Sequence, residues 1–234
     1  MHSYAQTNIQ LYDQLQRLEY SASDIAAVRR AYDLTQQLMP GRFRPSGKPL
    51  QDHLVGTASI LAASRAPLKF LIVGLLHAVY SEGDFGIAGH LSNKAKRRRI
   101  QEVLDEKTEN LVAAYAAFPW NTQSILNAAR DFNALTSAQR DVLLLRLAND
   151  IEDNLDLAVL YCPNRDDRLE YLRRCGPAMV EIAKQLGFPE LSEELEKSHA
   201  ALLDCKVLEE FPFAIESLPH GFSRQGFVMT TSTS

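Results

Sequence analysis

The stretch GLLHAVYSEGDFG (residues 74–86) decides how this sequence is interpreted, because an apolar helical run ends there in a polar cluster. His77 closes the apolar run, and Glu82 and Asp84 follow among glycines, as in a metal-site helix that opens into a catalytic loop. Ala78 stands directly after His77, where such a stretch would be expected to carry a second metal ligand. The pattern predicts an active site, an altered active site, or a helix end that only resembles one.

The rest of the 234 residues predicts a single all-α domain of about ten helices. Apolar residues recur at helical spacing, and no segment alternates with the period of two that half-buried strands require. Prolines and glycines separate the periodic segments, and no repeat or low-complexity linker divides the chain. The expected helices cover residues 9–20, 23–39, 50–64, 68–80, 93–118, 122–130, 137–161, 166–187 and 189–203. Residues 204–234 are expected to form a C-terminal extension.

Composition restricts the function classes. The formal net charge is −4, so no basic surface indicates a nucleic-acid partner. No apolar run approaches the roughly 18 residues that a membrane-spanning helix needs. The first residues lack a basic, apolar secretory leader, and three cysteines are too few for a disulfide framework. We therefore expect a cytoplasmic protein with a small-molecule partner and leave a homo-oligomer open.

Two further polar signals lie against the apolar background. The loop RFRPSGKPLQDH (42–53) brings three basic residues directly before His53. In LANDIEDN (147–154) and the two residues after it, polar side chains fill six of the eight positions from 149 to 156. Such a run covers every side of two helical turns, so some of these groups must face inward, where a buried carboxylate needs a partner.

Three segments together resemble the HD-domain superfamily of metal-dependent phosphohydrolases, and most closely its alarmone (guanosine polyphosphate) hydrolase domains. RPSGKPLQDHLVGTASIL is similar to their segment with the first metal-binding histidine, and LLHAVYSEGDFG to their segment with the His-Asp pair. LLLRLANDIEDNLDL is similar to their segment with the later aspartate. The order and spacing of the segments agree. The resemblance implies an HD-like helical core over about residues 25–190.

In that family a divalent metal, usually manganese, is held by a first histidine, a His-Asp pair and a later aspartate. The resemblance places the two histidines at His53 and His77. Ala78 replaces the aspartate of the pair, and Asn149 stands at the position of the later aspartate, with Asp150 one step on. The resemblance therefore implies a degenerate metal site.

Other site residues follow from the same resemblance. The catalytic Glu-Asp of the family corresponds to Ser81 and Glu82, or to Glu82 and Asp84 if the loop is longer, and its conserved asparagine corresponds to Asp153. We expect His77, Glu82, Asp84 and Asp153 to be catalytic, Arg42, Arg44, Ser46, Lys48 and Asn149 to bind substrate, and His53 and His77 to bind metal.

The lost ligands matter physically, because a hard divalent cation prefers anionic oxygen ligands. Asp150 is a poor replacement for the lost aspartate, since one helical step turns a side chain by about 100°. Asp153 lies one turn beyond Asn149 and shares its face, and Glu82 or Asp84 could also complete a shifted site. The prediction is a rearranged site for manganese, iron or zinc, or a site without metal.

Three functions remain open. The first is an HD-type enzyme that acts on a nucleotide or another phosphorylated small molecule through an altered site. The second is a metal-free enzyme on the same fold that uses acid–base residues on a small organic substrate. The third is a degenerate, non-catalytic HD protein that binds a ligand.

The run KAKRRR (94–99) is the one dense positive cluster of the sequence. It is interpreted either as a solvated helix start or as a group that recruits a phosphorylated ligand together with Arg42, Arg44 and Lys48. Cations at a helix start oppose the helix dipole, which favours the second interpretation slightly.

Overall fold

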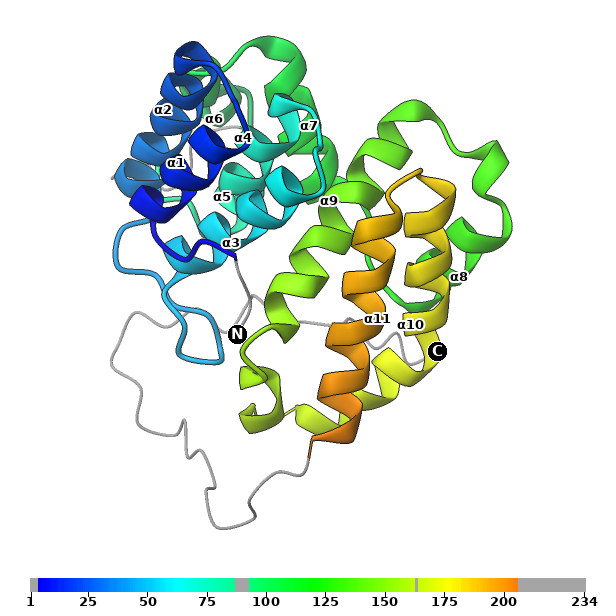
Figure 1. The fold of residues 1–234 in the computed structure, drawn as a ribbon. Helices are drawn as coiled ribbons and strands as arrows, with labels where there is room; N and C mark the ends of the chain where they lie inside the picture. Colours follow the sequence, from blue (N-terminus) through cyan, green and yellow to red (C-terminus); the bar gives the residue numbers. More distant parts are fainter. Residues whose placement is uncertain (1–3, 87–92, 163, 206–234) are drawn as a thin grey trace. The chain divides into compact units, whose positions relative to one another are not determined.

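The computed structural model describes residues 4–86, 93–162 and 164–205, and its regular elements in these ranges are all helices (Figure 1). The predicted all-α class is confirmed. The chain divides into two compact units: unit 1 comprises Met1–Arg42 and Pro49–Phe118, and unit 2 comprises Phe43–Lys48 and Pro119–Ser234. The predicted extension lies almost wholly outside the described residues, and the domain boundaries stay a prediction.

Unit 1 consists of seven helices within its described residues. In this part of the chain α3 packs most extensively on α4, while α2 and α7 also contact α4. The helices are α1 (Asn8–Arg17), α2 (Ala22–Leu38), α3 (Leu50–Ala63), α4 (Leu68–Leu76), α5 (Val79–Glu82), α6 (Asn93–Gln101) and α7 (Glu106–Ala117).

Unit 2 is built around the long helices α9, α10 and α11, with α8 against α10. Its elements are α8 (Thr122–Arg130), the 3-10 helix η1 (Phe132–Ala134), α9 (Ser137–Asn154), the 3-10 helix η2 (Ala158–Tyr161), α10 (Arg165–Gln185) and α11 (Pro189–Asp204). Among the described residues of both units, no helix combines the length and apolar character needed to cross a membrane.

Side-chain caps begin several helices where the sequence offers them. The Ser21 hydroxyl accepts the backbone N–H of Asp24 and begins α2, and Thr136 accepts the backbone N–H of Gln139 and begins α9. In both cases the third residue of the helix returns a side-chain acceptor to the backbone N–H of the cap, which completes a capping box.

Several predicted helices divide or end earlier than their apolar periodicity suggested, among them those over 68–80, 93–118 and 137–161. The segment 93–118 divides into α6 and α7, because the Asp105 carboxylate accepts the backbone N–H of Thr108 at 2.9 Å and starts a new helix. The helix predicted over 137–161 ends at Asn154, and Leu157 then adopts a left-handed φ of 57°. The helix predicted over 68–80 ends at Leu76, and a separate short α5 follows.

The close approach of α3 and α4 forms the centre of unit 1. Gly74 permits it, since a Cβ atom there would lie 2.9 Å from Cδ1 of Leu61 and 3.4 Å from the backbone of Ala58. Leu61 and Ala58 are fully buried, and so is the α4 residue Leu75. A side chain at position 74 would force the buried Leu61 side chain to shift, in the contact between the helix that carries His53 and the helix that ends just before His77.

Unit 2 contains a buried charge cluster on α9, α10 and α11. Asp150 of α9 accepts a hydrogen bond from Nη2 of Arg168 at 2.6 Å, lies 2.8 Å from Nε2 of His199, and accepts from Asn154 at 3.1 Å. Burial alone would raise the pKa of Asp150, but Arg168 and His199 outweigh it and lower the pKa to about 2. Gly176 leaves room for the His199 ring, because a Cβ there would lie 3.0 Å from Nδ1.

This cluster predicts how acid affects stability. The pKa of Asp150 is lower in the folded than in the unfolded chain, so its contribution is present above about pH 4 and is lost as the pH falls towards about 2. We expect Asp150→Asn to lower the free energy of unfolding at pH 7 by about 3 kcal/mol or more, because Arg168 is left buried without its carboxylate.

Urea unfolding of wild type and Asp150→Asn at pH 5 and pH 2.5 checks this prediction. The difference between the two proteins should shrink at the lower pH. Asp166→Asn, at a side chain that is 87% exposed, is the control and should change stability little. His199→Gln is a milder variant if Asp150→Asn does not fold. A difference that is independent of pH would contradict the assignment.

Candidate functional site

Two predicted metal ligands of unit 1 face each other. His53 lies in the first turn of α3, and His77 is the C-cap residue that directly follows α4. Their Nε2 atoms are 3.3 Å apart, and both side chains are buried. Nδ1 of His77 lies 2.8 Å from the carbonyl oxygen of Gly74, so this nitrogen carries the proton and Nε2 presents its lone pair. The helix end thus fixes the orientation and the tautomer of His77.

The histidine pair fits part of a metal site. Two neighbouring nitrogen ligands of one ion, at metal–nitrogen distances of about 2.1 Å, lie roughly 3.0 to 3.4 Å apart. The observed separation of 3.3 Å falls in this range. Histidines that bind metals usually donate their other ring N–H to a backbone carbonyl or a carboxylate, as His77 does to Gly74. The pair therefore has both the spacing and the supporting contact of metal-binding histidines.

The surroundings of the pair in unit 1 are apolar and aromatic. The ring of Tyr115 on α7 lies 5.0 Å from the His77 ring, and Ala78 is buried beside it. Neither Glu82 nor Asp84 joins the two histidines in a group of three ligand atoms within 4.8 Å, as judged over the described residues. Glu82 is half-buried at the end of α5, and the exposed Asp84 accepts the backbone N–H of Gly86 at 2.8 Å. Their catalytic roles stay a prediction.

A buried carboxylate that the sequence analysis did not select holds the helices around the pair. Glu109 on α7 accepts hydrogen bonds from Arg97 of α6 at 2.6 to 2.9 Å, from Gln101 at 3.0 Å and from the Tyr80 hydroxyl of α5. Burial and the Glu109 carboxylate raise the pKa of Tyr80, so its hydroxyl remains a donor. In the sequence, Glu109 stands three residues before the apolar Val112 and therefore shares its face of the helix, which is the pattern that indicates its burial.

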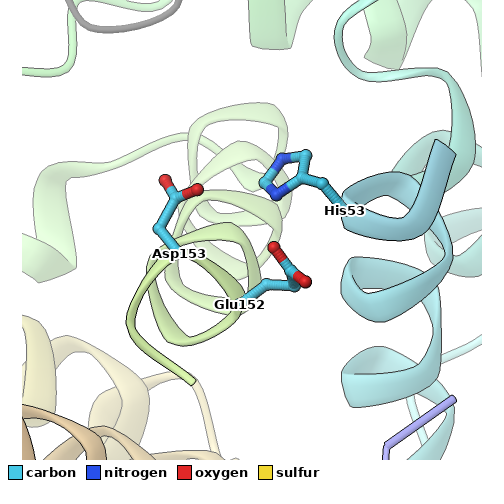
Figure 2. Close-up of side chains that lie close together, drawn as sticks. All are labelled: His53, Glu152 and Asp153. Atoms are coloured by element: carbon cyan, nitrogen blue, oxygen red, sulfur yellow. The ribbon is translucent and has the colours of Figure 1, made fainter. Parts of the chain in front are cut away.

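In unit 2 the predicted substrate-binding loop lies against the C-terminal turns of α9. Arg44 pairs with Asp153, with Nη2 2.5 Å from Oδ1, and Nζ of Lys48 binds the Glu152 carboxylate. Asn149 donates a hydrogen bond to Asp153 at 3.0 Å, which confirms that positions 149 and 153 share a face. Figure 2 shows the Glu152 and Asp153 side chains leaving α9 at successive positions, and His53 on α3.

The charges of this cluster are tightly coupled. Burial raises the pKa of Glu152 well above its usual value and Asp153 raises it further, while Lys48 and Arg44 lower it. Lys48 also lies 3.7 Å from the half-exposed Asp156. Two cations therefore face three carboxylates, and the cations of the loop are held by acidic partners. Sequence reasoning noted Glu152 in the polar run but did not choose it as a site residue.

The remaining predicted residues have separate positions. Asp150 points to Arg168 and His199, so it does not replace Asn149, as the rotation of one helical step had indicated. Arg42 belongs to unit 1, where its carbonyl accepts the backbone N–H of Leu50 at 2.9 Å and begins α3. Ser46 is half-buried in the loop of unit 2.

Comparison with known proteins gives three findings. Residues 34–119 match the model of a family described as a domain of unknown function (DUF6817). The guanosine-3′,5′-bis(diphosphate) 3′-pyrophosphohydrolase of Borreliella burgdorferi is 28% identical over 195 residues, which cover 79% of this chain and 27% of that protein. A solved structure of a metazoan orthologue of SpoT that hydrolyses ppGpp aligns with a TM-score of 0.49 and 18% identity, over 76% of this chain and 94% of that chain.

The similarity to the pyrophosphohydrolase confirms the resemblance to alarmone hydrolase domains that the three sequence segments indicated. The chain spans about a quarter of the length of this curated relative, since the match covers 27% of it.

The acidic cluster of unit 2 leads to a prediction about pH. The pKa of Glu152 is raised in the folded chain, so its contribution to stability is complete below its unfolded value of about 4.5 and is lost as the pH rises towards the folded value. Glu152→Gln imitates the protonated side chain. We expect its free energy of unfolding, relative to wild type, to increase as the pH rises above about 5.

Urea unfolding at pH 5 and pH 8 measures this change. Glu190→Gln, at an exposed position in the first turn of α11, is the control and should show the same difference from wild type at both pH values. A Glu152→Gln protein whose relative stability falls as the pH rises would show that Glu152 is ionised and firmly stabilised by Lys48.

Proposed function

We propose that this chain acts on a phosphorylated nucleotide with a divalent metal ion that His53 and His77 hold in part. The observation that carries this proposal is the pair of Nε2 atoms 3.3 Å apart, with the other ring nitrogen of His77 bound to the Gly74 carbonyl. Similarity to a guanosine-3′,5′-bis(diphosphate) 3′-pyrophosphohydrolase supports a nucleotide as the substrate class. The proposal selects the first of the three functions left open by the sequence.

A bound divalent metal would supply charge stabilisation at a phosphate oxygen and would lower the pKa of water. With the proton on Nδ1, Nε2 of His77 carries the lone pair that faces Nε2 of His53, and both imidazoles are buried. Ala78 offers no oxygen ligand, so the affinity for a hard cation is expected to be lower than with the usual His-Asp pair. The altered motif therefore weakens the metal site without removing its histidines.

In unit 2 we propose Arg44 and Lys48 as groups that bind phosphate. Each holds a carboxylate, Asp153 and Glu152 respectively, and phosphate oxygens are alternative anionic acceptors for the same N–H donors. Their side chains are 12% and 13% exposed, so their partners already orient them. Binding a phosphate would require each cation to exchange or share its carboxylate, which predicts moderate affinity.

A metal-free enzyme is the second candidate, and the same pair of histidines supports it. Because His77 carries its proton on Nδ1, its Nε2 can accept an N–H from Nε2 of His53 without any metal. Such a coupled pair could take up and release one proton, as acid–base catalysis requires. Metal binding therefore separates the two candidates.

Metal content is the first test. Protein purified without chelator or an affinity metal is incubated with manganese, desalted and measured by inductively coupled plasma mass spectrometry. We expect bound metal in the wild type and its loss in both His53→Ala and His77→Ala. Ala78→Asp restores an oxygen ligand and should raise manganese affinity at least about tenfold, since even outer-shell partners of metal sites contribute that much. Ala26→Asp, at an exposed position of α2, is the matched control.

Activity is measured as release of pyrophosphate from guanosine-3′,5′-bis(diphosphate) with manganese. Ala78→Asp should increase the rate and His77→Ala should abolish it, with circular dichroism confirming that each variant folds. A wild type and an Ala78→Asp protein that both fail to bind manganese would overturn the metal proposal and favour the metal-free candidate.

A further inference from the structure

A pocket lies within unit 1, between the end of α2, the Asp84–Phe85 segment and one face of α6. Figure 1 shows the helices α2 and α6 in this unit. Its volume is about 470 Å³, which is in the range of small-molecule sites. The lining combines the charged residues Asp84, Arg98, Arg99 and Glu102 with Gln37, Leu38, Phe85 and Ala95. An apolar wall and a pair of guanidinium groups thus meet in one concavity.

The helical register of α6 creates this face. Positions 95, 98, 99 and 102 follow the spacing of one side of a helix, and each lines the pocket. Arg97, between them, turns the other way and binds the buried Glu109 of α7. This anchor fixes the rotation of α6, so Arg98 and Arg99 are held towards the pocket. The basic run of the sequence therefore divides into one structural arginine and two arginines that line the pocket.

The charged residues of the lining differ in whether they have a partner. Arg99 pairs with Glu102 at 2.5 Å, and Asp84 accepts the backbone N–H of Gly86 at 2.8 Å. Arg98 is exposed and has no ion-pair partner within the described ranges. A guanidinium that is planar, always charged and available is well suited to a phosphate group. The half-buried Phe85 offers an aromatic ring to a base attached to that phosphate, and Nζ of Lys96 lies 5.3 Å from the centre of this ring.

We propose that this pocket is a metal-independent binding site for a nucleotide, separate from the histidine pair. The diphosphate would bind Arg98 and share Arg99 with Glu102, and the base would pack against Phe85. Binding here would act on α6, whose Arg97 binds Glu109 of α7 together with Tyr80 of α5. The site lies beyond the proposed catalytic function and does not depend on it.

Isothermal titration calorimetry with GDP and with inorganic pyrophosphate, in the presence of EDTA, tests the proposal. GDP should bind more tightly than pyrophosphate, because its base adds apolar contact. Arg98→Ala should weaken GDP binding about tenfold or more, and Arg98→Lys should restore part of it, because lysine keeps the charge but not the planar fork. Glu102→Gln should strengthen binding, since it releases Arg99 from its carboxylate.

Two controls separate this site from the proposed active site. Arg30→Ala, at an exposed arginine of α2, should leave GDP binding unchanged. His77→Ala should also leave it unchanged, whether or not the metal proposal holds. The inference is overturned if GDP does not bind with EDTA present, if binding requires manganese and His77, or if Arg98→Ala and Glu102→Gln have no effect.

Discussion

The close contact of α3 with α4 at Gly74 is the constraint on which unit 1 depends. Without a side chain at this position, Leu61 and Ala58 reach the α4 backbone, and the two helices that carry His53 and His77 meet. The carbonyl oxygen of the same glycine accepts a hydrogen bond from Nδ1 of His77. The same residue thus gives room to the Leu61 side chain and fixes the tautomer of a histidine, which links the packing of the core to the chemistry of the pair.

Buried carboxylates organise the rest of the molecule, and each is satisfied in a different way. Glu109 accepts hydrogen bonds from three residues, Tyr80 of α5 and Arg97 and Gln101 of α6. Asp150 contacts an arginine, an asparagine and a histidine. Glu152 instead faces a lysine and a neighbouring aspartate, and its pKa rises. Groups that are fully satisfied fix helices in place, whereas the imperfectly compensated Glu152 is suited to exchange partners.

Much of the fold could be predicted from the sequence, because helix caps and apolar periodicity are local signals. Ser21 and Thr136, which cap α2 and α9, are residue types that favour a helix start. The polar run after Ala148 required inward carboxylates, as Asp150 and Glu152 show.

The partners of those carboxylates could not be predicted. Arg44 and Asp153 are 109 residues apart, and nothing local distinguishes Arg97, which is structural, from Arg98 beside it. The resemblance predicted which histidines would meet, but neither Glu82 nor Asp84 joins them among the described residues.

The loop from Phe43 to Lys48 is synthesised well before the rest of the unit to which it belongs. It belongs to unit 2, yet it lies between two stretches of unit 1 and is synthesised long before α9. Lys48 and Glu152 are separated by 104 residues, so the loop leaves the ribosome well before its acidic partners exist. Unit 2 therefore cannot be obtained intact as a fragment that begins at Pro119, because Asp153 and Glu152 would then lack the cations that the N-terminal part of the chain supplies.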